Sequence, residues 1–308
     1  MLVDFLLLAF GFILLIRGAD YFVEGASALA ARLCIPPIVI GLTVVAMGTS
    51  APEAAVSIVS ALQGSNGITL GNVIGSNIAN ILLILGVTSV ISSLTVQKTT
   101  VRYELPFMGA ITLLLCIMGA HYGMVTRGCA FVLLGLFAAF LVYLYFFSCD
   151  GKCETPEIRP LSRLKIALYV ILGIVALIWG SNLTVESASD IARHLGVSQR
   201  LIGLTIVALG TSLPELVISI IAARKGQADL AIGNIIGSNI FNILFVLGLA
   251  GAILPIAFSP AFLFDCTMAL VAVALLMLFV SRDCLLSRSN GMVFLVVYAA
   301  YILHLAMA

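Results

Sequence analysis

The chain has 308 residues, of which 62% are hydrophobic and 9% are charged, and its formal net charge is +1. Its mean hydropathy is +1.22. This composition excludes a soluble globular protein. The sequence also carries no nucleotide-binding, phosphate-cradling or nucleic-acid-binding signature. We therefore expect a protein that crosses a membrane many times.

Apolar runs of about 20 residues recur along the whole chain, and each is long enough to cross about 30 Å of hydrocarbon as a helix. We predict ten spans. They cover residues 2–31, 37–62, 68–92, 105–121, 128–147, 164–192, 201–223, 228–254, 261–280 and 291–306. The first run follows no basic segment and shows no cleavage site, so we expect it to be a span and not a removed signal.

A polar segment at residues 148–163 divides these spans into two sets of five. It contains two prolines and charges of both signs, and it is too short to fold as a domain. We therefore expect a first five-helix unit over residues 1–147, a linker over 148–163 and a second five-helix unit over 164–308.

Two motifs occur once in each unit. The first reads IGLTVVAMGTSAPE at 40–53 and IGLTIVALGTSLPE at 202–215. The second reads GNVIGSNIAN at 71–80 and GNIIGSNIFN at 233–242. Both are shifted by 162 positions, from 53 to 215 and from 80 to 242. One uniform shift indicates one duplicated unit.

The distribution of basic residues predicts the orientation. Most of the 15 Lys and Arg residues fall on alternate connections, which include the linker. Because basic connections stay in the cytoplasm, we expect the N-terminus outside. Five spans per unit then place the second unit upside down relative to the first. Inverted repeats of this kind are typical of secondary transporters, whose site lies where the repeats meet.

The first motif combines a proline with oxygen-bearing side chains. Pro52 and Pro214 should interrupt their helices near Gly48 and Gly210, because proline cannot donate to the carbonyl four residues earlier. Oxygen atoms follow within one turn in both copies, at Thr49, Ser50, Glu53, Thr211, Ser212 and Glu215. Na⁺ and Ca²⁺ prefer such ligands. A carboxylate in mid-bilayer costs about 2.5 to 3.5 kcal/mol, which favours a function for both acids over a merely kinked helix with a protonated Glu.

The second motif supplies an opposite wall. Its GxxxG spacing allows another helix to approach closely. Ser76 and Asn80 lie one turn apart on one helix face, as do Ser238 and Asn242. With the acidic motifs, these side chains outline a cage for a cation.

The Gly-Thr-Ser-x-Pro-Glu and Gly-Ser-Asn-Ile-x-Asn repeats resemble the two α-repeats of the sodium/calcium exchangers, in the calcium/cation antiporter superfamily. The resemblance covers the whole chain and is similar to the prokaryotic type, which lacks a large regulatory domain. It implies that Glu53 and Glu215 are shared by Ca²⁺ and Na⁺, with Thr49 and Thr211 adding oxygens to the central site. It also implies outer Na⁺ sites and a lining of the middle. These would use Ser50, Ser76, Ser212, Ser238, Asn80, Asn242 and the carbonyls of Ala46 and Ala208.

We therefore expect an electrogenic antiporter of Na⁺ and Ca²⁺ in the cell (inner) membrane of a prokaryote. Ca²⁺ and Na⁺ are its substrates and membrane lipid surrounds it, and we expect no cofactor, protein partner or nucleic acid. K⁺-dependent relatives carry Asp where this chain has Asn242, so we expect no K⁺ requirement. The alternative is Ca²⁺/H⁺ exchange or K⁺-dependent Na⁺/Ca²⁺ exchange. A passive cation channel is an alternative from another functional class. We expect no enzyme, because no span pairs a serine with a suitable base.

Overall fold

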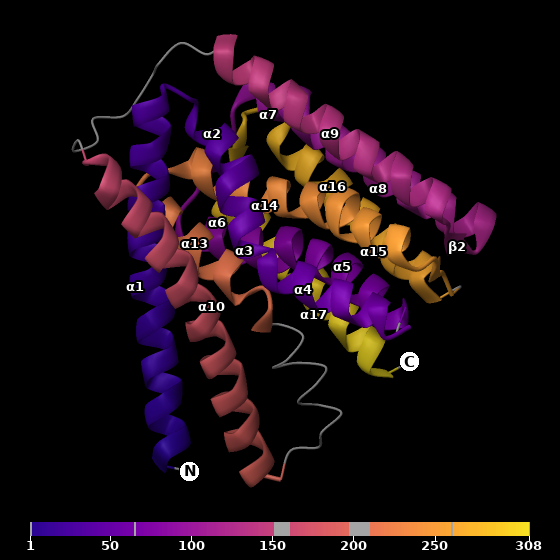
Figure 1. Cartoon of the computed structure of the whole chain (residues 1–308), viewed down its shortest axis with the longest axis horizontal. Helices are drawn as coiled ribbons and strands as arrows, with labels where there is room; N and C mark the ends of the chain where they lie inside the picture. Colours follow the sequence, from indigo (N-terminus) through magenta and orange to yellow (C-terminus); the bar gives the residue numbers. More distant parts are fainter. Residues whose placement is uncertain (1, 65, 151–160, 197–209, 260, 308) are drawn as a thin grey trace.

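The structure is a computed structural model, and it describes residues 2–64, 66–150, 161–196, 210–259 and 261–307. Helices dominate both halves of the chain, including short π-helical segments labelled η (Figure 1). The first half contains α1 (Leu2–Leu33), α2 (Pro37–Ile40), η1 (Gly41–Val45), α3 (Ala46–Thr49), α4 (Ala51–Leu62), α5 (Asn66–Ala79), η2 (Asn80–Leu85), α6 (Gly86–Ile91), β1 (Leu94–Thr95), α7 (Lys98–Arg102), α8 (Glu104–Tyr122), β2 (Met124–Val125) and α9 (Arg127–Asp150). The second half contains α10 (Arg163–His194), α13 (Leu213–Arg224), α14 (Ala228–Phe241), η4 (Asn242–Val246), α15 (Leu247–Ile253), β3 (Ile256–Ala257), α16 (Ala261–Val280), β4 (Leu285–Leu286) and α17 (Arg288–Met307).

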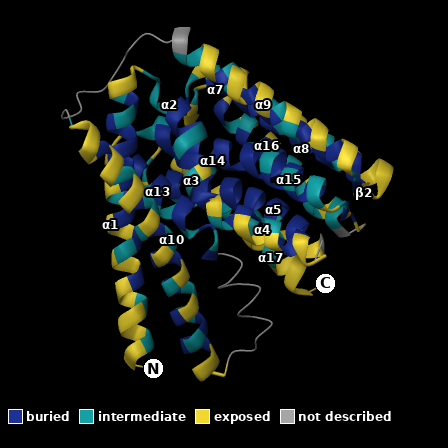
Figure 2. Ribbon diagram, viewed as in Figure 1, coloured by how far each residue is buried: buried dark blue, intermediate teal, exposed yellow. Residues whose placement is uncertain are grey.

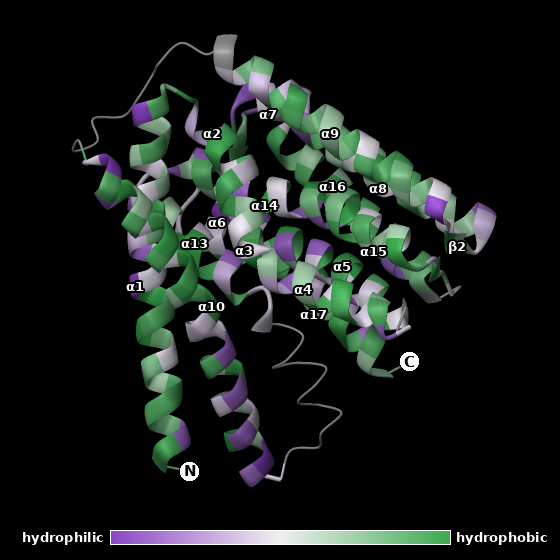
Figure 3. Ribbon diagram, viewed as in Figure 1, coloured by the Kyte–Doolittle hydropathy of each residue, from purple (hydrophilic) through white to green (hydrophobic). Residues whose placement is uncertain are grey.

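Eight described helices are long and apolar enough to cross a membrane, or nine if the bent pair 37–62 forms one span. Nine of the ten predicted spans therefore have a counterpart. The remaining one, predicted at 201–223, lies partly outside the described residues, and α13 represents its described part. Exposed residues lie on the outward faces and many of them are hydrophobic, whereas the centre is buried (Figures 2 and 3). Trp179, for example, is 69% exposed. The chain is an integral membrane protein.

The most deeply buried membrane helices are those that carry the second motif. In the continuous helical segment Ala228–Ile253, 83% of the most apolar 18-residue stretch is buried, and in Gly67–Ile91 the share of the corresponding stretch is 72%. In the peripheral helix α17 it is only 17%. A helix buried on all sides presents its polar groups to protein and not to lipid. The serine and asparagine residues of the second motif are therefore shielded from the bilayer.

The two longest helices, α1 and α10, pack side by side and extend beyond the rest of the bundle (Figure 1). Each has 32 residues, more than the roughly 20 that a perpendicular span needs. Gly11 faces Gly180 near the start of α1, whereas Gly25 faces Tyr169 near its end. Residue numbers thus rise along α1 as they fall along α10, so the two helices are antiparallel. These two helices, which occupy equivalent positions in the two halves, therefore run in opposite directions.

Two pairs of very short strands join the halves, and the sequence did not predict them. Strand β1 pairs with β4, with Leu94 opposite Leu286. Strand β2 pairs with β3, with Val125 opposite Ile256. Leu94 and Ile256 differ by the same 162 positions as the motifs, so the two ladders are equivalent under the internal repeat. Each connects a first-half strand to a second-half strand.

The first motif does break its helix, but slightly later than predicted. Helix α3 continues through Thr49, and the axis bends by 50° before α4. The break falls at Ser50 instead of Gly48, because the Ser50 amide still donates a 2.9 Å bond to the carbonyl of Ala46. Pro52, inside the next turn, has no amide hydrogen to continue the ladder. In the second copy Ser212 stands directly before α13.

Candidate functional site

Two carboxylates occupy the first turns of α4 and α13. Glu53 and Glu215 are each 1% exposed. Each helix has a proline at its start, where the missing amide hydrogen costs no bond. Each carboxylate therefore lies in the protein interior at a helix N-terminus. The positive end of the helix dipole favours a negative charge at this position.

Each carboxylate is held by hydroxyl groups of the opposite half. Ser50 Oγ donates a 2.9 Å hydrogen bond to Glu215 Oε1. The side chains of Thr211 and Ser212 lie within reach of the Glu53 carboxylate. The structure thus brings both acidic motifs of the sequence into one site, with each half contributing ligands to the acid of the other.

Several buried acceptor atoms in this region have no hydrogen-bond donor among the described residues. Four of them are related in pairs by the internal repeat, and a serine hydroxyl is a fifth. They are Glu53 Oε2, Glu215 Oε2, Asn80 Oδ1, Asn242 Oδ1 and Ser238 Oγ. Buried polar atoms without a partner are costly, and a set of unpaired oxygens is the environment that a hard cation satisfies.

The amides of Asn80 and Asn242 are oriented by two asparagines that the sequence reasoning did not select. Asn80 Nδ2 donates to Asn239 Oδ1 at 2.9 Å, and Asn242 Nδ2 donates to Asn77 Oδ1 at 3.1 Å. Asn77 and Asn239 are anchored by donating to each other's backbone carbonyls, both at 3.2 Å. Because the NH₂ groups are used in this ring, the unpaired atoms of Asn80 and Asn242 are their oxygens. The shared shift of 162 positions was the signal that could have identified Asn77 and Asn239.

A second pair of asparagines supports the helix breaks. Asn72 Nδ2 donates to the Glu53 carbonyl at 3.1 Å and to Ser57 Oγ at 2.9 Å. Asn234 Nδ2 makes the equivalent bonds to the Glu215 carbonyl at 3.4 Å and to Ser219 Oγ at 3.1 Å. Asn234 Oδ1 also accepts a 3.1 Å bond from Thr49 Oγ1, across the two halves. Both residues follow the first glycine of the second motif, and the sequence reasoning missed their role.

The remaining predicted ligands differ in burial and in hydrogen bonding. Ser76 and Ser212 are buried, whereas Thr211 is half-buried. The Ala46 carbonyl accepts a bond from Ser50 N at 2.9 Å, so it is not a free ligand in this structure. Thr49 Oγ1 lies 3.2 Å from the same carbonyl, but its single hydrogen is shared with Asn234 Oδ1. Ala208 lies outside the described residues, so its predicted role is not tested.

The glycines of the second motif allow the close approach that its spacing predicted. A Cβ at Gly237 would lie 2.7 Å from the Cβ of Ala46 and from the backbone of Leu42. Helix α14 therefore packs directly against η1 and α3. The segment that would face Gly71 and Gly75 in the same way lies outside the described residues. Helices η2 and η4 begin at Asn80 and Asn242, and such π-helical turns are frequent at functional sites.

The donor set indicates the class of ion. No cluster of three His, Cys, Asp or Glu residues that could hold a metal occurs in the described part of the chain. Carboxylate, amide and hydroxyl oxygens are the ligands of hard cations such as Na⁺ and Ca²⁺, whereas thiolate and imidazole select softer metals. The site therefore fits a hard cation.

Comparison with known proteins assigns the chain to a family. The model of the family described as sodium/calcium exchanger protein matches residues 3–146 and 165–307. The chain is 44% identical over 263 residues to the putative antiporter CaxA of Alkalimonas amylolytica, covering 83% of this chain and 82% of the relative. It is 34% identical over 344 residues to the sodium/calcium exchanger MaX1 of Methanosarcina acetivorans, covering 98% of both. Its fold matches the sodium-calcium exchanger NCX_Mj soaked with zero Na⁺ and Ca²⁺, with a TM-score of 0.87, 31% identity and 99% of both chains covered. The chain belongs to the sodium/calcium exchanger family.

Proposed function

We propose that this protein exchanges Na⁺ for Ca²⁺ by alternating access at the site built around Glu53 and Glu215. The observation that carries the proposal is the set of unpaired acceptor oxygens on Glu53, Glu215, Asn80 and Asn242. The similarity to an exchanger named for Na⁺ and Ca²⁺ over 98% of both chains supports the same ions.

The charge of the site supports an electrogenic cycle. Two ionised carboxylates supply about −2, which balances one Ca²⁺. In the family's exchange, the Na⁺ ions carry one positive charge more than the Ca²⁺ that they replace. One net charge moving across the membrane couples transport to voltage at about 2.3 kcal/mol per 100 mV. Because Asn242 is an amide and adds no third negative charge, the proposed cycle needs no K⁺.

The proposed architecture is ten spans in two inverted five-helix repeats, with the N-terminus outside. The antiparallel packing of α1 and α10 supports inversion, since these helices occupy equivalent positions in the two halves. A site shared by both halves suits alternating access, because rocking one repeat against the other exposes it to either side. The proposed location is the cell membrane of a prokaryote, as for the inner membrane protein of Escherichia coli to which the chain is 37% identical over 274 residues.

Individual ligand roles follow the same proposal. Glu53 and Glu215 take part in both ion-bound states, with Thr49, Thr211 and the oxygens of Asn80 and Asn242 around the central ion. Ser50, Ser212, Ser76 and Ser238 contribute to the flanking Na⁺ positions. The Ala46 carbonyl joins them once the bonds that it accepts from Ser50 and Thr49 lengthen, and Ala208 is its counterpart.

Ca²⁺/H⁺ exchange is the second candidate, because one observation also favours it. Glu53 and Glu215 are both buried, and two buried carboxylates can be neutralised by protons as well as by metal ions. The same unpaired oxygens would then carry H⁺ in one direction and Ca²⁺ in the other.

Uptake of ⁴⁵Ca²⁺ into proteoliposomes distinguishes these functions. Vesicles containing purified protein would be loaded with Na⁺, K⁺ or acidic buffer and diluted into a common medium, with membrane potential clamped by an ionophore. We expect uptake from Na⁺-loaded vesicles only, and an interior-positive potential should accelerate it. Uptake driven equally by a proton gradient would support Ca²⁺/H⁺ exchange instead, and uptake without any counter-ion would indicate a channel.

A further inference from the structure

A second buried acid lies in a cavity between α8 and α9, outside the ion site. The cavity has a volume of about 310 Å³. Its walls are mostly aromatic, with Glu104 inside and the exposed Arg102 at its edge. The aromatic residues are Tyr103, Phe107, Phe140 and Tyr143. At about 30 Å³ per water molecule, the cavity has room for about ten waters. This is enough space for one polar headgroup.

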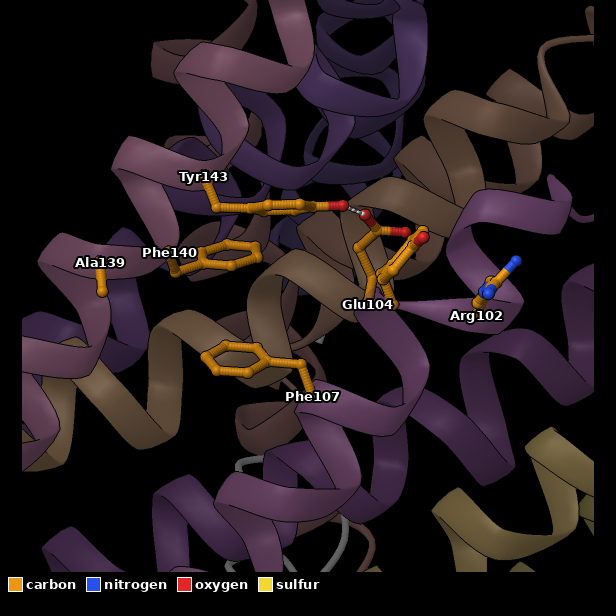
Figure 4. A pocket seen from close by; sticks show the side chains of 7 residues that line it. Arg102, Glu104, Phe107, Ala139, Phe140 and Tyr143 are labelled. Atoms are coloured by element: carbon orange, nitrogen blue, oxygen red, sulfur yellow. Dashed lines mark hydrogen bonds between the residues drawn. The ribbon is translucent and has the colours of Figure 1, made fainter.

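Only one of the two carboxylate oxygens of Glu104 has a hydrogen-bond donor among the described residues. Its side chain is 2% exposed, at the first residue of α8. The hydroxyl of Tyr143 donates to Glu104 Oε1, as Figure 4 shows. The other oxygen, Oε2, is buried and has no hydrogen-bond partner among the described residues. Such an atom calls for a donor, because an unpaired buried carboxylate oxygen is costly.

The aromatic walls narrow the class of donor. The rings of Phe107 and Phe140 are stacked with centroids 5.3 Å apart, and the Tyr143 ring continues the stack at 6.3 Å from Phe140 (Figure 4). A metal ion would find one carboxylate and few other oxygens here, which is a poor ligand set. A primary ammonium carries the hydrogens that Glu104 Oε2 lacks, and aromatic faces also attract a positive charge.

Two features at the edge of the cavity indicate that the ligand is an amphiphile, with a phosphate and an apolar chain. Arg102 lies at the end of α7, with its guanidinium carbon 5.7 Å from the centre of the Tyr103 ring. A guanidinium in this position suits a phosphate. From Phe107, an exposed apolar stripe continues along α8 through Ala110, Leu113 and Ile117 at helical spacing. An acyl chain can lie along this stripe.

We propose that the cavity binds the headgroup of a phospholipid that has a primary ammonium, namely phosphatidylethanolamine. The ammonium donates to Glu104 Oε2, the phosphate faces Arg102, and an acyl chain follows the exposed stripe of α8. Phosphatidylcholine has the same charge but no ammonium hydrogens, so it cannot satisfy Glu104 Oε2. The site therefore distinguishes two lipids that differ only in N-methylation.

Native mass spectrometry of the full-length protein in detergent tests this proposal. Phosphatidylethanolamine and phosphatidylcholine with identical acyl chains would be titrated separately and in competition. We expect the wild type to retain one molecule of the ethanolamine lipid with a preference of about tenfold, the scale of one charge-assisted hydrogen bond. In Glu104→Gln we expect the preference to fall to about one. Asp265→Asn is the matched control, because Asp265 also accepts a bond from a tyrosine, Tyr301, at 2.9 Å, but is only partly buried.

Equal retention of the two lipids by the wild type would overturn the proposal, and this outcome does not depend on any variant folding. An unchanged preference in a folded Glu104→Gln, judged by its melting temperature, would also overturn it. Soluble phosphorylethanolamine provides a third arm. If it displaced the lipid at equal concentration, the acyl stripe would contribute nothing and the occupant would be a free headgroup compound instead of a lipid.

Discussion

Ser50 Oγ donates a 2.9 Å hydrogen bond to Glu215 Oε1, although the two residues are 165 positions apart and belong to different halves of the chain. Both side chains are almost fully buried. The helix break of one half therefore positions a hydroxyl on the carboxylate of the other half. Movement of the halves against each other would change both the ligand set and this bond, which couples ion occupancy to conformation.

Replacing Ser50 by alanine should weaken ion binding without unfolding the protein. A hydrogen bond to a charged group contributes about 1.5 to 3 kcal/mol, which corresponds to roughly 10- to 100-fold in affinity. We expect the Ca²⁺ concentration for half-maximal ⁴⁵Ca²⁺ uptake to rise within that range. Ser60→Ala is the control, since Ser60 is a buried serine of α4, the helix that begins directly after Ser50. Equal kinetics in both variants would show that the Ser50 bond does not serve the site.

Replacing Asn239 by alanine should impair the site without removing any proposed ligand. Asn80 Nδ2 would lose its acceptor at Asn239 Oδ1, and its amide could rotate and present NH₂ to the cation. We expect about a tenfold loss of Ca²⁺ affinity, from the cost of about 1 to 3 kcal/mol for a buried group left unpaired. Calorimetric titration with Ca²⁺ measures it. Asn290→Ala is the control, because Asn290 bonds only locally, to Ser287, among the contacts observed. Wild-type affinity in Asn239→Ala would contradict the orienting role.

A methyl group at Gly237 should destabilise the protein. Its Cβ would lie 2.7 Å from the Cβ of Ala46 and from the backbone of Leu42, so α14 would have to move away from η1 and α3. Overpacking of this kind costs about 1 to 3 kcal/mol. We expect Gly237→Ala to melt at a lower temperature in detergent than the wild type. The control is Gly135→Ala, where the added atom meets nothing within 4 Å. A melting temperature for Gly237→Ala at or above that of Gly135→Ala would refute this close packing.

Asn242 should decide whether a third charge enters the cycle. The wild type should exchange Na⁺ for Ca²⁺ at zero K⁺. In Asn242→Asp the site charge becomes about −3, so we expect transport to depend on K⁺ or on pH, as the new acid binds a cation or a proton. Titration of K⁺ at constant ionic strength, repeated at several pH values, measures this. A strict K⁺ requirement in the wild type would show that Asn242 does not control coupling.

Much of the fold was accessible from the sequence, because hydrophobic length identifies spans and a uniform shift identifies a duplication. The structure's α10, for example, runs from Arg163 to His194 where residues 164–192 were predicted. The strand pairs were not predictable, since two-residue strands leave no periodic pattern. The helix break was predicted near Gly48 and lies two residues later, at Ser50. A proline identifies the amide hydrogen that is missing, but it does not identify the residue at which the helix axis bends.

The candidate site was predicted as a list of oxygen-bearing side chains, and the structure adds how they are arranged. The two acidic motifs do come together, because Ser50 of the first motif is bonded across the halves to Glu215 of the second. Asn77, Asn239, Asn72 and Asn234 were missed, because an asparagine that orients another side chain looks in sequence like any polar residue in a packed helix. Their repetition at a shift of 162 positions marks them as part of the duplicated motif, but their orienting role follows only from the contacts in the structure, which join Asn77 to Asn239 across the halves and Asn72 to Glu53 within one half.

The central claim is that Glu53 and Glu215 together form one cation site, and equilibrium binding of ⁴⁵Ca²⁺ to the purified protein tests it most directly. Glu53→Gln and Glu215→Gln each keep the shape of the side chain and remove half of the negative charge. We expect each to lose saturable binding by on the order of a hundredfold, while Glu24→Gln, at an exposed carboxylate of α1, binds as the wild type does. Wild-type Ca²⁺ affinity in either Glu53→Gln or Glu215→Gln, with folding confirmed by an unchanged melting temperature, would contradict the shared site.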